Sequence, residues 1–318
     1  MKTLIVVSGG DASGINTVIA RYTMQARRQG DEVIGVTGGF AGVLRSQFEP
    51  IDLSLVRLLE GSGGSYLTSS RDPVLSDTEA QVTLRAVLED AQIDNMLLFG
   101  GDGTLRHVLP LLNQWQVPVI ALPTTIDNDI AGTERTLGFD SACNFAYGVI
   151  SGALATAHAL PGRIFMVETL GGNTGYLALD IGFATGAHAV LLPEYTFEMS
   201  WLSRHLKQAI TKDGFALVVL SEGVTDVMSD LSERIVELTD TRVRFTRLGH
   251  AQRGGTVSHG DRRLASEMAY LAYRALREGV SNGAIIVRNG TTQLYQRTFG
   301  ADTKPSPDYD LYRLVNSV

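Results

Sequence analysis

Two stretches decide the fold: Gly100-Gly101-Asp102-Gly103-Thr104 and Pro123-Thr124-Thr125-Ile126-Asp127-Asn128-Asp129. The apolar run from Met96 to Phe99 predicts a buried strand before the first stretch, and the run from Val117 to Leu122 predicts another before the second. Apolar residues at helical spacing fill the segment between them, up to Gln114. This alternation indicates an α/β fold with a parallel sheet, and each stretch follows the carboxyl end of a strand.

The first stretch has the composition of a phosphate-binding loop. Its glycines allow backbone N–H groups to approach phosphate oxygens, and the start of a helix favours negative charge. Asp102 lies within this loop, where its carboxylate would repel phosphates unless Mg²⁺ lay between them. We therefore expect Asp102 to hold Mg²⁺, either directly or through its water shell.

The second stretch contributes another carboxylate. Loops that follow neighbouring parallel strands lie at the same edge of the sheet, so Asp127 and Asp102 are expected to be neighbours. One carboxylate would then serve the cation and the other would take a proton from an attacking hydroxyl, as in phosphoryl transfer. The alternative is that both stretches are ordinary turns, because Gly, Asp and Asn are common turn formers. Their position directly behind two buried strands favours phosphoryl transfer.

Length and composition exclude several classes of protein. The chain has 318 residues, of which 44% are hydrophobic and 19% charged, which is typical of a globular protein with a substantial core. No apolar run approaches the roughly 18 residues of a membrane span. The net charge of -7 argues against nucleic-acid binding. The single cysteine, Cys143, excludes an internal disulfide framework, so a cytoplasmic location is expected.

Other segments carry charge or glycine in suggestive positions. Gly9 to Gly14 predicts a second glycine turn before a helix, although a plain strand–helix turn is the alternative. A flexible loop from Gly61 to Ser70 precedes Arg71. A strand over Arg242 to Leu248 is expected to place its three arginines on one face, where a solvated charged surface is the alternative.

These motifs together resemble the 6-phosphofructokinases. The similarity extends from Ser8-Gly9-Gly10-Asp11, through Thr125 to Asp129, to the segment Leu248 to Gly255. It implies the phosphofructokinase fold, with two doubly wound, Rossmann-like α/β domains and mainly parallel sheets. The larger, nucleotide- and Mg²⁺-binding domain would comprise residues 1–138 with 252–301. The smaller, sugar-phosphate-binding domain would comprise residues 139–251 with 302–318.

The resemblance also implies roles for individual residues on the nucleotide side. Arg71 would bridge the donor and acceptor phosphates, and Phe40 would stack on adenine, although it could equally be an ordinary buried aromatic. The full set expected to bind ATP is Gly10, Phe40, Arg71, Asp72, Gly101, Asp102, Gly103 and Thr104.

On the sugar side, Asp127 would be the proton acceptor, assisted by Thr125 and Arg71. Glu222 would bind a sugar hydroxyl, unless it is only a solvated surface charge. Arg163, Arg244, His250 and Arg253 would bind the 6-phosphate, with Arg163 and Arg244 supplied by a neighbouring subunit of a homotetramer or dimer. The full set expected to bind substrate is Thr125, Asp127, Asp129, Arg163, Leu170, Gly171, Glu222, Arg244, His250 and Arg253.

The chain departs from the family pattern at Gly172, where most bacterial relatives have arginine. We expect transfer of the γ-phosphoryl group of ATP to O1 of fructose 6-phosphate. Use of pyrophosphate, use of a related ketose phosphate, and a catalytically weak sugar-phosphate sensor are the alternatives. The family's effector arginines correspond to Ala20, Met24, Leu53 and a position near Ala155, so control by nucleoside diphosphate or phosphoenolpyruvate is expected to be absent.

Overall fold

The structure is a computed structural model that describes residues 1–70, 74–296 and 304–317. The chain divides into two compact units. Unit 1 comprises Met1–Ser141 with Arg253–Lys304, and unit 2 comprises Ala142–Gln252 with Pro305–Val318. The chain therefore passes between the units at three points, and each unit is described by itself.

Unit 1 is built on a seven-stranded sheet with the order β11-β10-β5-β4-β1-β2-β3. The five central strands are parallel, whereas the edge strands β3 and β11 pair antiparallel with their neighbours. The strands are β1 (Lys2–Ser8), β2 (Glu32–Val36), β3 (Phe48–Pro50), β4 (Asn95–Gly100), β5 (Val119–Pro123), β10 (Asn282–Arg288) and β11 (Thr291–Tyr295). Asn289 and Gly290 both have positive φ in the hairpin between β10 and β11.

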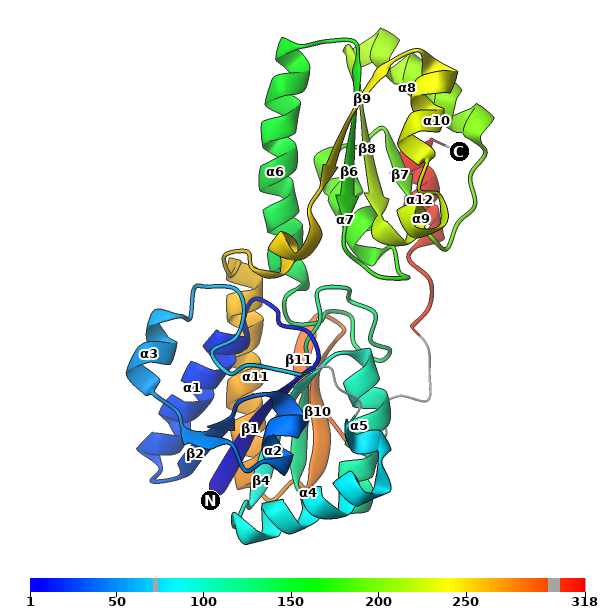
Figure 1. The fold of residues 1–318 in the computed structure, drawn as a ribbon. Helices are drawn as coiled ribbons and strands as arrows, with labels where there is room; N and C mark the ends of the chain where they lie inside the picture. The colour runs from blue at the N-terminus through cyan, green and yellow to red at the C-terminus, as the bar shows by residue number, and fades with distance from the viewer. Residues whose placement is uncertain (71–73, 297–303, 318) are drawn as a thin grey trace. The chain divides into compact units, whose positions relative to one another are not determined.

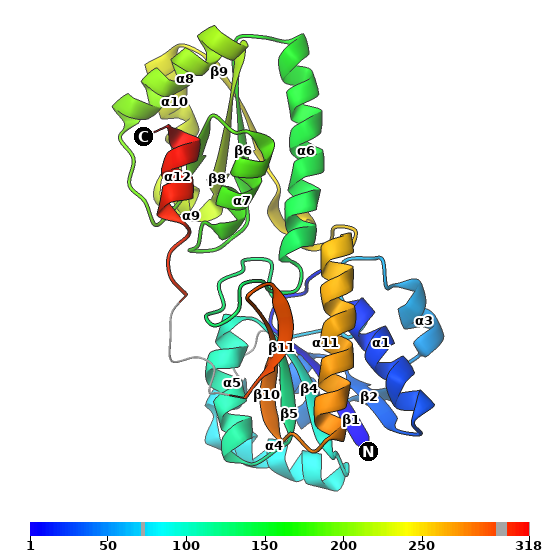
Figure 2. The ribbon, with the colours of Figure 1, turned by 180° about the vertical axis from the view of Figure 1, so that it is seen from behind.

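Helices cover both faces of this sheet, as the two opposite views show (Figures 1 and 2). Helices α2 (Gly39–Leu44), α4 (Thr78–Asp90) and α5 (Asp102–Gln114) lie on one side. Helices α1 (Ile15–Arg28), α3 (Leu53–Leu58) and α11 (His259–Arg277) lie on the other. Side chains alternate between the faces of a strand, so both faces of a central strand can be buried only by two such layers.

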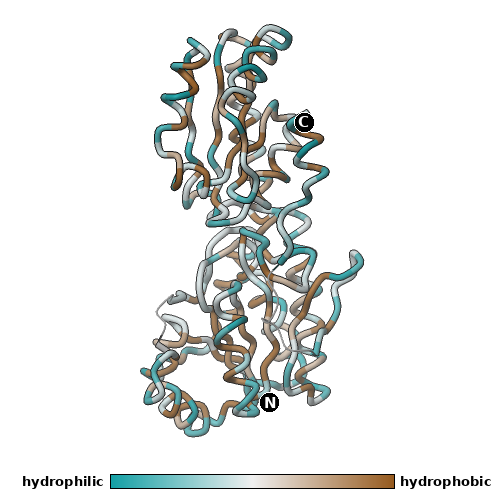
Figure 3. Tube along the Cα trace, turned by 90° about the vertical axis from the view of Figure 1, so that its right-hand side faces the viewer, coloured by the Kyte–Doolittle hydropathy of each residue, from teal (hydrophilic) through white to brown (hydrophobic). Residues whose placement is uncertain are grey.

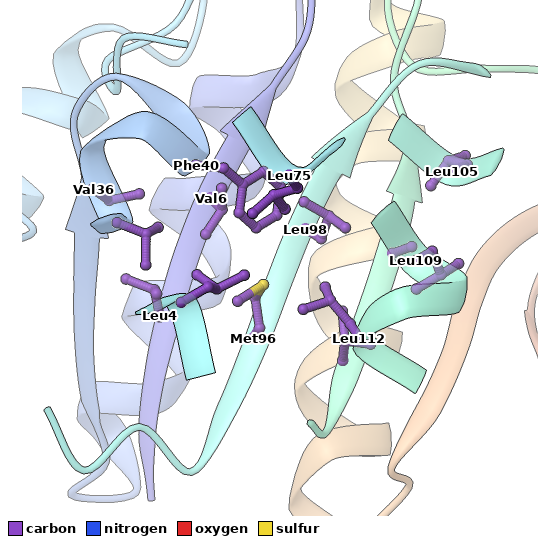
Figure 4. Close-up of a cluster of buried hydrophobic side chains, with 14 of the residues drawn as sticks. Leu4, Val6, Val36, Phe40, Leu75, Met96, Leu98, Leu105, Leu109 and Leu112 are labelled. Carbon is purple, nitrogen blue, oxygen red and sulfur yellow. The ribbon is translucent and has the colours of Figure 1, made fainter. Parts of the chain in front are cut away.

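The core under α2, α4 and α5 explains why β4 reads as a continuous apolar run. Met96 and Leu98 of β4 pack with Leu4 and Val6 of β1 and with side chains of α5 such as Leu109 (Figure 4). Leu97 and Phe99, on the opposite face, are also fully buried. Burial on both faces leaves no polar position between Met96 and Phe99.

Unit 2 contains a four-stranded, entirely parallel sheet with the order β7-β8-β6-β9. Its strands are β6 (Arg163–Thr169), β7 (Ala189–Leu191), β8 (Phe215–Ser221) and β9 (Arg242–Arg247). Its helices are α6 (Phe139–Ala159), which begins in unit 1, α7 (Tyr176–Thr185), α8 (Met199–Asp213), α9 (Glu222–Val227), α10 (Leu231–Thr239) and α12 (Tyr309–Asn316). Short 3₁₀ turns occur at Val74–Ser76 and Gly249–Arg253.

The core of unit 2 follows the same rule as that of unit 1. Ile164 and Met166 of β6 pack with Leu202 and Leu206 of α8 and with Ile235 of α10. Hydrophobic colour accordingly follows the central strands, while hydrophilic colour gathers on the outer helices (Figure 3).

The prediction of an α/β fold with mainly parallel sheets is confirmed by the strand order of both units. None of the described helices is both long and apolar enough to cross a bilayer.

One expectation about β9 is wrong. Arg242 and Arg244 occupy alternate positions and share a face, but Arg247 is an odd number of residues further on and lies on the other face. There its guanidinium lies 5.4 Å from the ring centroid of Phe245 and pairs with Glu168 at 3.4 Å. One face of β9 therefore carries Arg242 and Arg244, and the other face carries Arg247.

Candidate functional site

The polar stretches of unit 1 converge because three strands end in register. Ser8 of β1 pairs with Gly100 of β4, and Gly100 pairs with Pro123 of β5. The amide of Thr124 donates to the carbonyl of Gly100 at 2.9 Å, which continues the pairing beyond the strand. The loops after β1, β4 and β5 therefore begin side by side at one edge of the sheet.

The glycine loop after β4 is packed against the loop after β1. The hydroxyls of Ser8 and Thr104 are 3.0 Å apart, and the amide of Gly9 donates to the carbonyl of Ser70 at 3.1 Å. A Cβ atom at Gly100 would lie 2.6 Å from the Thr104 side chain, so no other residue fits there. A Cβ at Gly103 would meet nothing within 4 Å. The first turn of α5 therefore faces open space at Gly103, as a phosphate-binding helix start requires.

The loop after β5 is fixed by its own side chains. Asn128 has a φ of +52°, and its side chain accepts from the Thr136 amide at 3.0 Å and donates to the Glu134 carbonyl at 3.2 Å. The Thr125 hydroxyl accepts a bond of 3.1 Å from the amide of Asp127. Because Asn tolerates the left-handed conformation better than most residues, it can form this turn and hold it at once.

Two aspartates of these loops have arginine neighbours. Asp102 accepts a hydrogen bond of 2.6 Å from Nε of Arg106, one helical turn further along α5. Asp127 lies 4.0 Å from the guanidinium of Arg253, whose side chain is mostly buried. Both carboxylates therefore face the same strand-end region with a fixed positive charge beside them.

Asp129, also on the loop after β5, is partly buried. Burial, and after it the charges of Asp127 and Asp102, raise its pKa to about 6. The charge of Lys304 opposes this shift. Lys304 donates from Nζ to the carbonyl of Asn128, and burial lowers its own pKa to about 8. The loop that carries Asp102 lies against the second loop, because a Cβ atom at Gly101 would lie 3.8 Å from the Thr125 side chain.

The expected sugar-phosphate residues lie in unit 2, apart from Arg253 and the residues of the loop after β5. Arg163 of β6 is in register with Arg242 of β9, and Phe165 is in register with Arg244. Side chains paired in this way project from one face of the sheet, so Arg163, Arg242 and Arg244 share a face. His250 follows β9 in the 3₁₀ turn Gly249–Arg253 and is exposed. Unit 2 therefore presents a basic face whose charges are largely accessible.

The loop after β6 lies next to the loop after β8. Glu222 accepts a 2.8 Å hydrogen bond from the amide of Gly172. Leu170 is buried, and its amide donates to the side chain of Gln252 at 2.9 Å. Gly171 and Gly172 have φ angles of +142° and +57°, so this turn depends on glycine. One carboxylate oxygen of Glu222 is therefore bound to the backbone of the neighbouring loop.

Comparison with known proteins decides the family. Residues 2–276 match the model of the family described as "Phosphofructokinase". The chain belongs to the phosphofructokinase family. It is 36% identical, over 91% of this chain and 86% of the relative, to the "ATP-dependent 6-phosphofructokinase" of Streptococcus pneumoniae.

Solved structures of phosphofructokinases have the same fold. The Pichia pastoris phosphofructokinase in the T-state matches with a TM-score of 0.85 and 26% identity over 92% of this chain. This chain spans about a third of that longer relative, 34% of its length. The pyrophosphate-dependent phosphofructokinase of Marinobacter aquaeolei matches with a TM-score of 0.86 and 19% identity, over 99% of this chain and 90% of that chain. At that identity the likeness concerns the fold alone.

Some expected residues of the phosphofructokinase site lie elsewhere or cannot be placed. Phe40 is only 5% exposed and belongs to the hydrophobic core of unit 1, so the structure supports its reading as a buried aromatic (Figure 4). Little of its ring remains for stacking on a base. Gly10 follows β1 as expected. Arg71 and Asp72 lie outside the described residues.

Three residues contact the candidate site although the sequence analysis gave them no role in it. Arg106 lies one helical turn after Asp102, a spacing that predicts an ion pair on a helix. Gln252 stands within the motif Leu248 to Gly255 but had been given no role. Lys304 precedes the last helix, α12, and no sequence pattern indicates which loop it contacts.

Proposed function

We propose that this chain is an ATP-dependent 6-phosphofructokinase, which transfers the γ-phosphoryl group of ATP to O1 of fructose 6-phosphate and forms fructose 1,6-bisphosphate. The observation that carries the proposal is the placement of Asp127 on the loop after β5, beside the glycine loop after β4. A glycine loop at a helix start suits the donor phosphates, and a carboxylate on the next loop suits the acceptor hydroxyl. Membership of the family supports the same reading.

Asp127 would accept the proton of the attacking O1 hydroxyl. The Thr125 hydroxyl accepts from the Asp127 amide and so fixes the backbone from which the carboxylate projects. Charge that develops on the transferring group is spread over several oxygens, which fixed cations stabilise. Arg253 would supply such a cation near O1, and Arg71 would supply another.

Mg²⁺ would be held by Asp102. Among the residues that the structure describes, no three His, Cys, Asp or Glu side chains form a ready-made metal cage. Mg²⁺ in kinases does not need one, because it is bound through one or two carboxylates, water and the substrate phosphates. Mutual repulsion among Asp102, Asp127 and Asp129, which contributes to the raised pKa of Asp129, also favours a divalent cation. When bound, the ion would neutralise charge on the donor phosphates.

Each unit would bind a different substrate. Unit 1 would bind the nucleotide, as the larger domain, and unit 2 would bind the sugar phosphate with Leu170, Gly171 and Glu222. Arg163, which is half-buried, and Arg244, which is exposed, share one face of the sheet, which supports their donation to the 6-phosphate site of a neighbouring subunit. This implies a homotetramer or dimer whose site is shared between subunits. Glycolytic turnover and a single cysteine both suit the cytoplasm.

ATP is the proposed donor because of the space at Gly103. In pyrophosphate-dependent relatives the corresponding residue is typically Asp, and a carboxylate would fill space needed by the α-phosphate. The open surroundings of Gly103 support the larger donor. Thr124 is 2% exposed and its hydroxyl donates to the Leu122 carbonyl, so it does not project a long side chain as the lysine of those relatives would.

A sugar-phosphate sensor with weak catalysis is the second candidate, and Gly172 is the observation that favours it. The test is an initial-rate assay of the purified protein with Mg-ATP and fructose 6-phosphate, alongside tagatose 6-phosphate, a seven-carbon ketose phosphate and free fructose. The kinase proposal predicts turnover that is highest with fructose 6-phosphate. Tight binding of fructose 6-phosphate without turnover would establish the sensor instead.

A further inference from the structure

Lys304 lies against the loop that carries Asp127 and Asp129. Its Nζ atom donates a hydrogen bond to the carbonyl of Asn128, the residue between these two aspartates. Asn128 is the left-handed residue of the turn, with φ of +52°. A carbonyl at such a turn has no strand or helix partner of its own, so an outside donor fixes its orientation. Lys304 therefore acts on the backbone that sets the directions of both carboxylates.

Lys304 also acts through its charge. The three carboxyls whose charges act on this loop are Asp102, Asp127 and Asp129. Asp102 has Arg106 at 2.6 Å and Asp127 has Arg253 at 4.0 Å. The charge of Lys304 acts on Asp129, together with that of Arg106 on α5.

The burial of Lys304 argues against an accidental surface contact. Burial lowers the pKa of Lys304 to about 8, while the charge of Asp129 acts in the opposite direction. A lysine that gives up hydration needs a compensating partner. Asp129 is similarly buried, and its Oδ1 atom has no hydrogen-bond partner among the described residues. The two groups thus share a poorly solvated region in which each offsets the charge of the other.

We propose that Lys304 is a positioning residue of the phosphoryl-transfer site, which fixes the turn at Asn128 and balances the charge of Asp129 so that Asp127 is held ready to accept its proton. The proposal rests on the proposed function for its role in turnover. It assigns a task to the C-terminal segment, which otherwise shows no chemistry. Lys304 is not proposed to contact the substrates.

The first test compares the kinetics of Lys304→Met, Lys304→Arg and the wild type with Mg-ATP and fructose 6-phosphate. Lys207→Met, on the exposed surface of α8, is the matched control for the loss of a lysine. Loss of a charged hydrogen-bond donor is expected to lower kcat about 10- to 100-fold, with KM for ATP changed much less. Lys304→Arg should recover most of the rate, and Lys207→Met should match the wild type. A kcat of Lys304→Met within twofold of the wild type would overturn the proposal.

The second test needs no substrate, so it remains informative if fructose 6-phosphate is not turned over. It compares the Tm of the wild type and Lys304→Met at pH 5 and at pH 7. The folded-state pKa of Asp129, about 6, lies above its ordinary value of 3.8, so Asp129 is largely protonated at pH 5 and ionised at pH 7 in the folded protein. Lys304 is charged at both pH values, and the other charged groups that act on Asp129 are Asp102, Asp127 and Arg106.

Charge balance by Lys304 therefore predicts a larger Tm difference at pH 7 than at pH 5. Equal differences at the two pH values would show a packing role only and would overturn the proposal. A pH-dependent difference in a protein that lacks activity on fructose 6-phosphate would instead uphold the contact and reject the proposed substrate.

Discussion

The guanidinium of Arg253 lies 4.0 Å from the carboxylate of Asp127, and both side chains are largely withdrawn from solvent. The positive charge of an arginine at this distance attracts a carboxylate, and a carboxylate is the form that can accept a proton. Arg253 is also the first residue of unit 1 after the chain returns from unit 2. A residue expected only to bind the 6-phosphate thus also neighbours the proposed catalytic base.

Asp127→Asn should nearly abolish turnover while leaving sugar-phosphate binding largely intact. Asparagine keeps the shape of the side chain but cannot accept the proton, and loss of a general base typically costs about 10²–10⁴ in rate. The measurements are kcat by steady-state assay and fructose 6-phosphate affinity by calorimetry. Asp94→Asn, on a distant loop, serves as the control. Near-native kcat in Asp127→Asn would remove Asp127 from the catalytic role.

Arg253→Ala should mainly raise KM for fructose 6-phosphate. It removes a cation from the expected phosphate pocket, and charged hydrogen bonds of this kind typically contribute about 1.5–3 kcal/mol, or roughly 10- to 100-fold. A smaller decrease in kcat should accompany it, because Asp127 loses its neighbouring charge. An unchanged KM would show that Arg253 does not bind the 6-phosphate. Arg253→Lys should restore the KM only in part, since lysine lacks the planar fork of arginine.

Gly103→Asp should lower kcat/KM for Mg-ATP without unfolding the protein. The site leaves room for a side chain, as a Cβ there meets nothing within 4 Å, so the effect should come from the occupied donor space and the added negative charge. Gly103→Asn separates size from charge. The assay compares Mg-ATP with pyrophosphate for each variant. A wild type that used pyrophosphate with the higher kcat/KM would contradict the proposed donor.

Millimolar ADP or phosphoenolpyruvate should not shift the half-saturation of the wild type for fructose 6-phosphate. Ala20 and Leu53 stand where relatives place effector arginines, and no apolar group replaces a guanidinium facing phosphate. A cavity of about 520 Å³ beside Leu53 is nevertheless lined by four other arginines, Arg21, Arg27, Arg57 and Arg262. Three of them already have partners in the protein, since Arg21 and Arg262 pair with Glu60 and Arg27 donates to the Ile51 carbonyl. We therefore do not expect this cavity to bind an effector phosphate.

Initial rates at subsaturating fructose 6-phosphate provide the measurement for this prediction. A several-fold shift that competition at the nucleotide site does not explain would contradict it. In that case Arg57→Ala, which changes an exposed member of the cavity, would show whether the cavity binds the effector.

Sequence patterns predicted the elements whose burial is periodic, and they failed where a single long side chain decides the contact. The runs before Gly100 and Pro123 became β4 and β5, because buried parallel strands leave a continuous apolar signal. The predicted face of Arg247 was wrong because Arg247 is three residues after Arg244, and side chains an odd number of residues apart lie on opposite faces of a strand. Phe40 could be read in two ways, since an aromatic after a strand suits both a core and a base-stacking surface. Lys304 was missed because it lies outside any helix or strand, so no periodic pattern predicts its contacts.

Gly172 makes its departure from the family pattern difficult to reverse. Its φ of +57° favours glycine, and any other residue there would cost roughly 1–2 kcal/mol. The amide of Gly172 donates a hydrogen bond to Glu222. The carbonyl oxygen of Gly172 packs closely on Gly223, where an added Cβ atom would lie only 2.7 Å from it. Arginine at this position would have open space for its side chain, since a Cβ atom there meets nothing within 4 Å, but it would carry this backbone cost. Selection for faster turnover would therefore act first on other positions, and homologues with this glycine turn should recruit their phosphate-binding cations elsewhere in the chain.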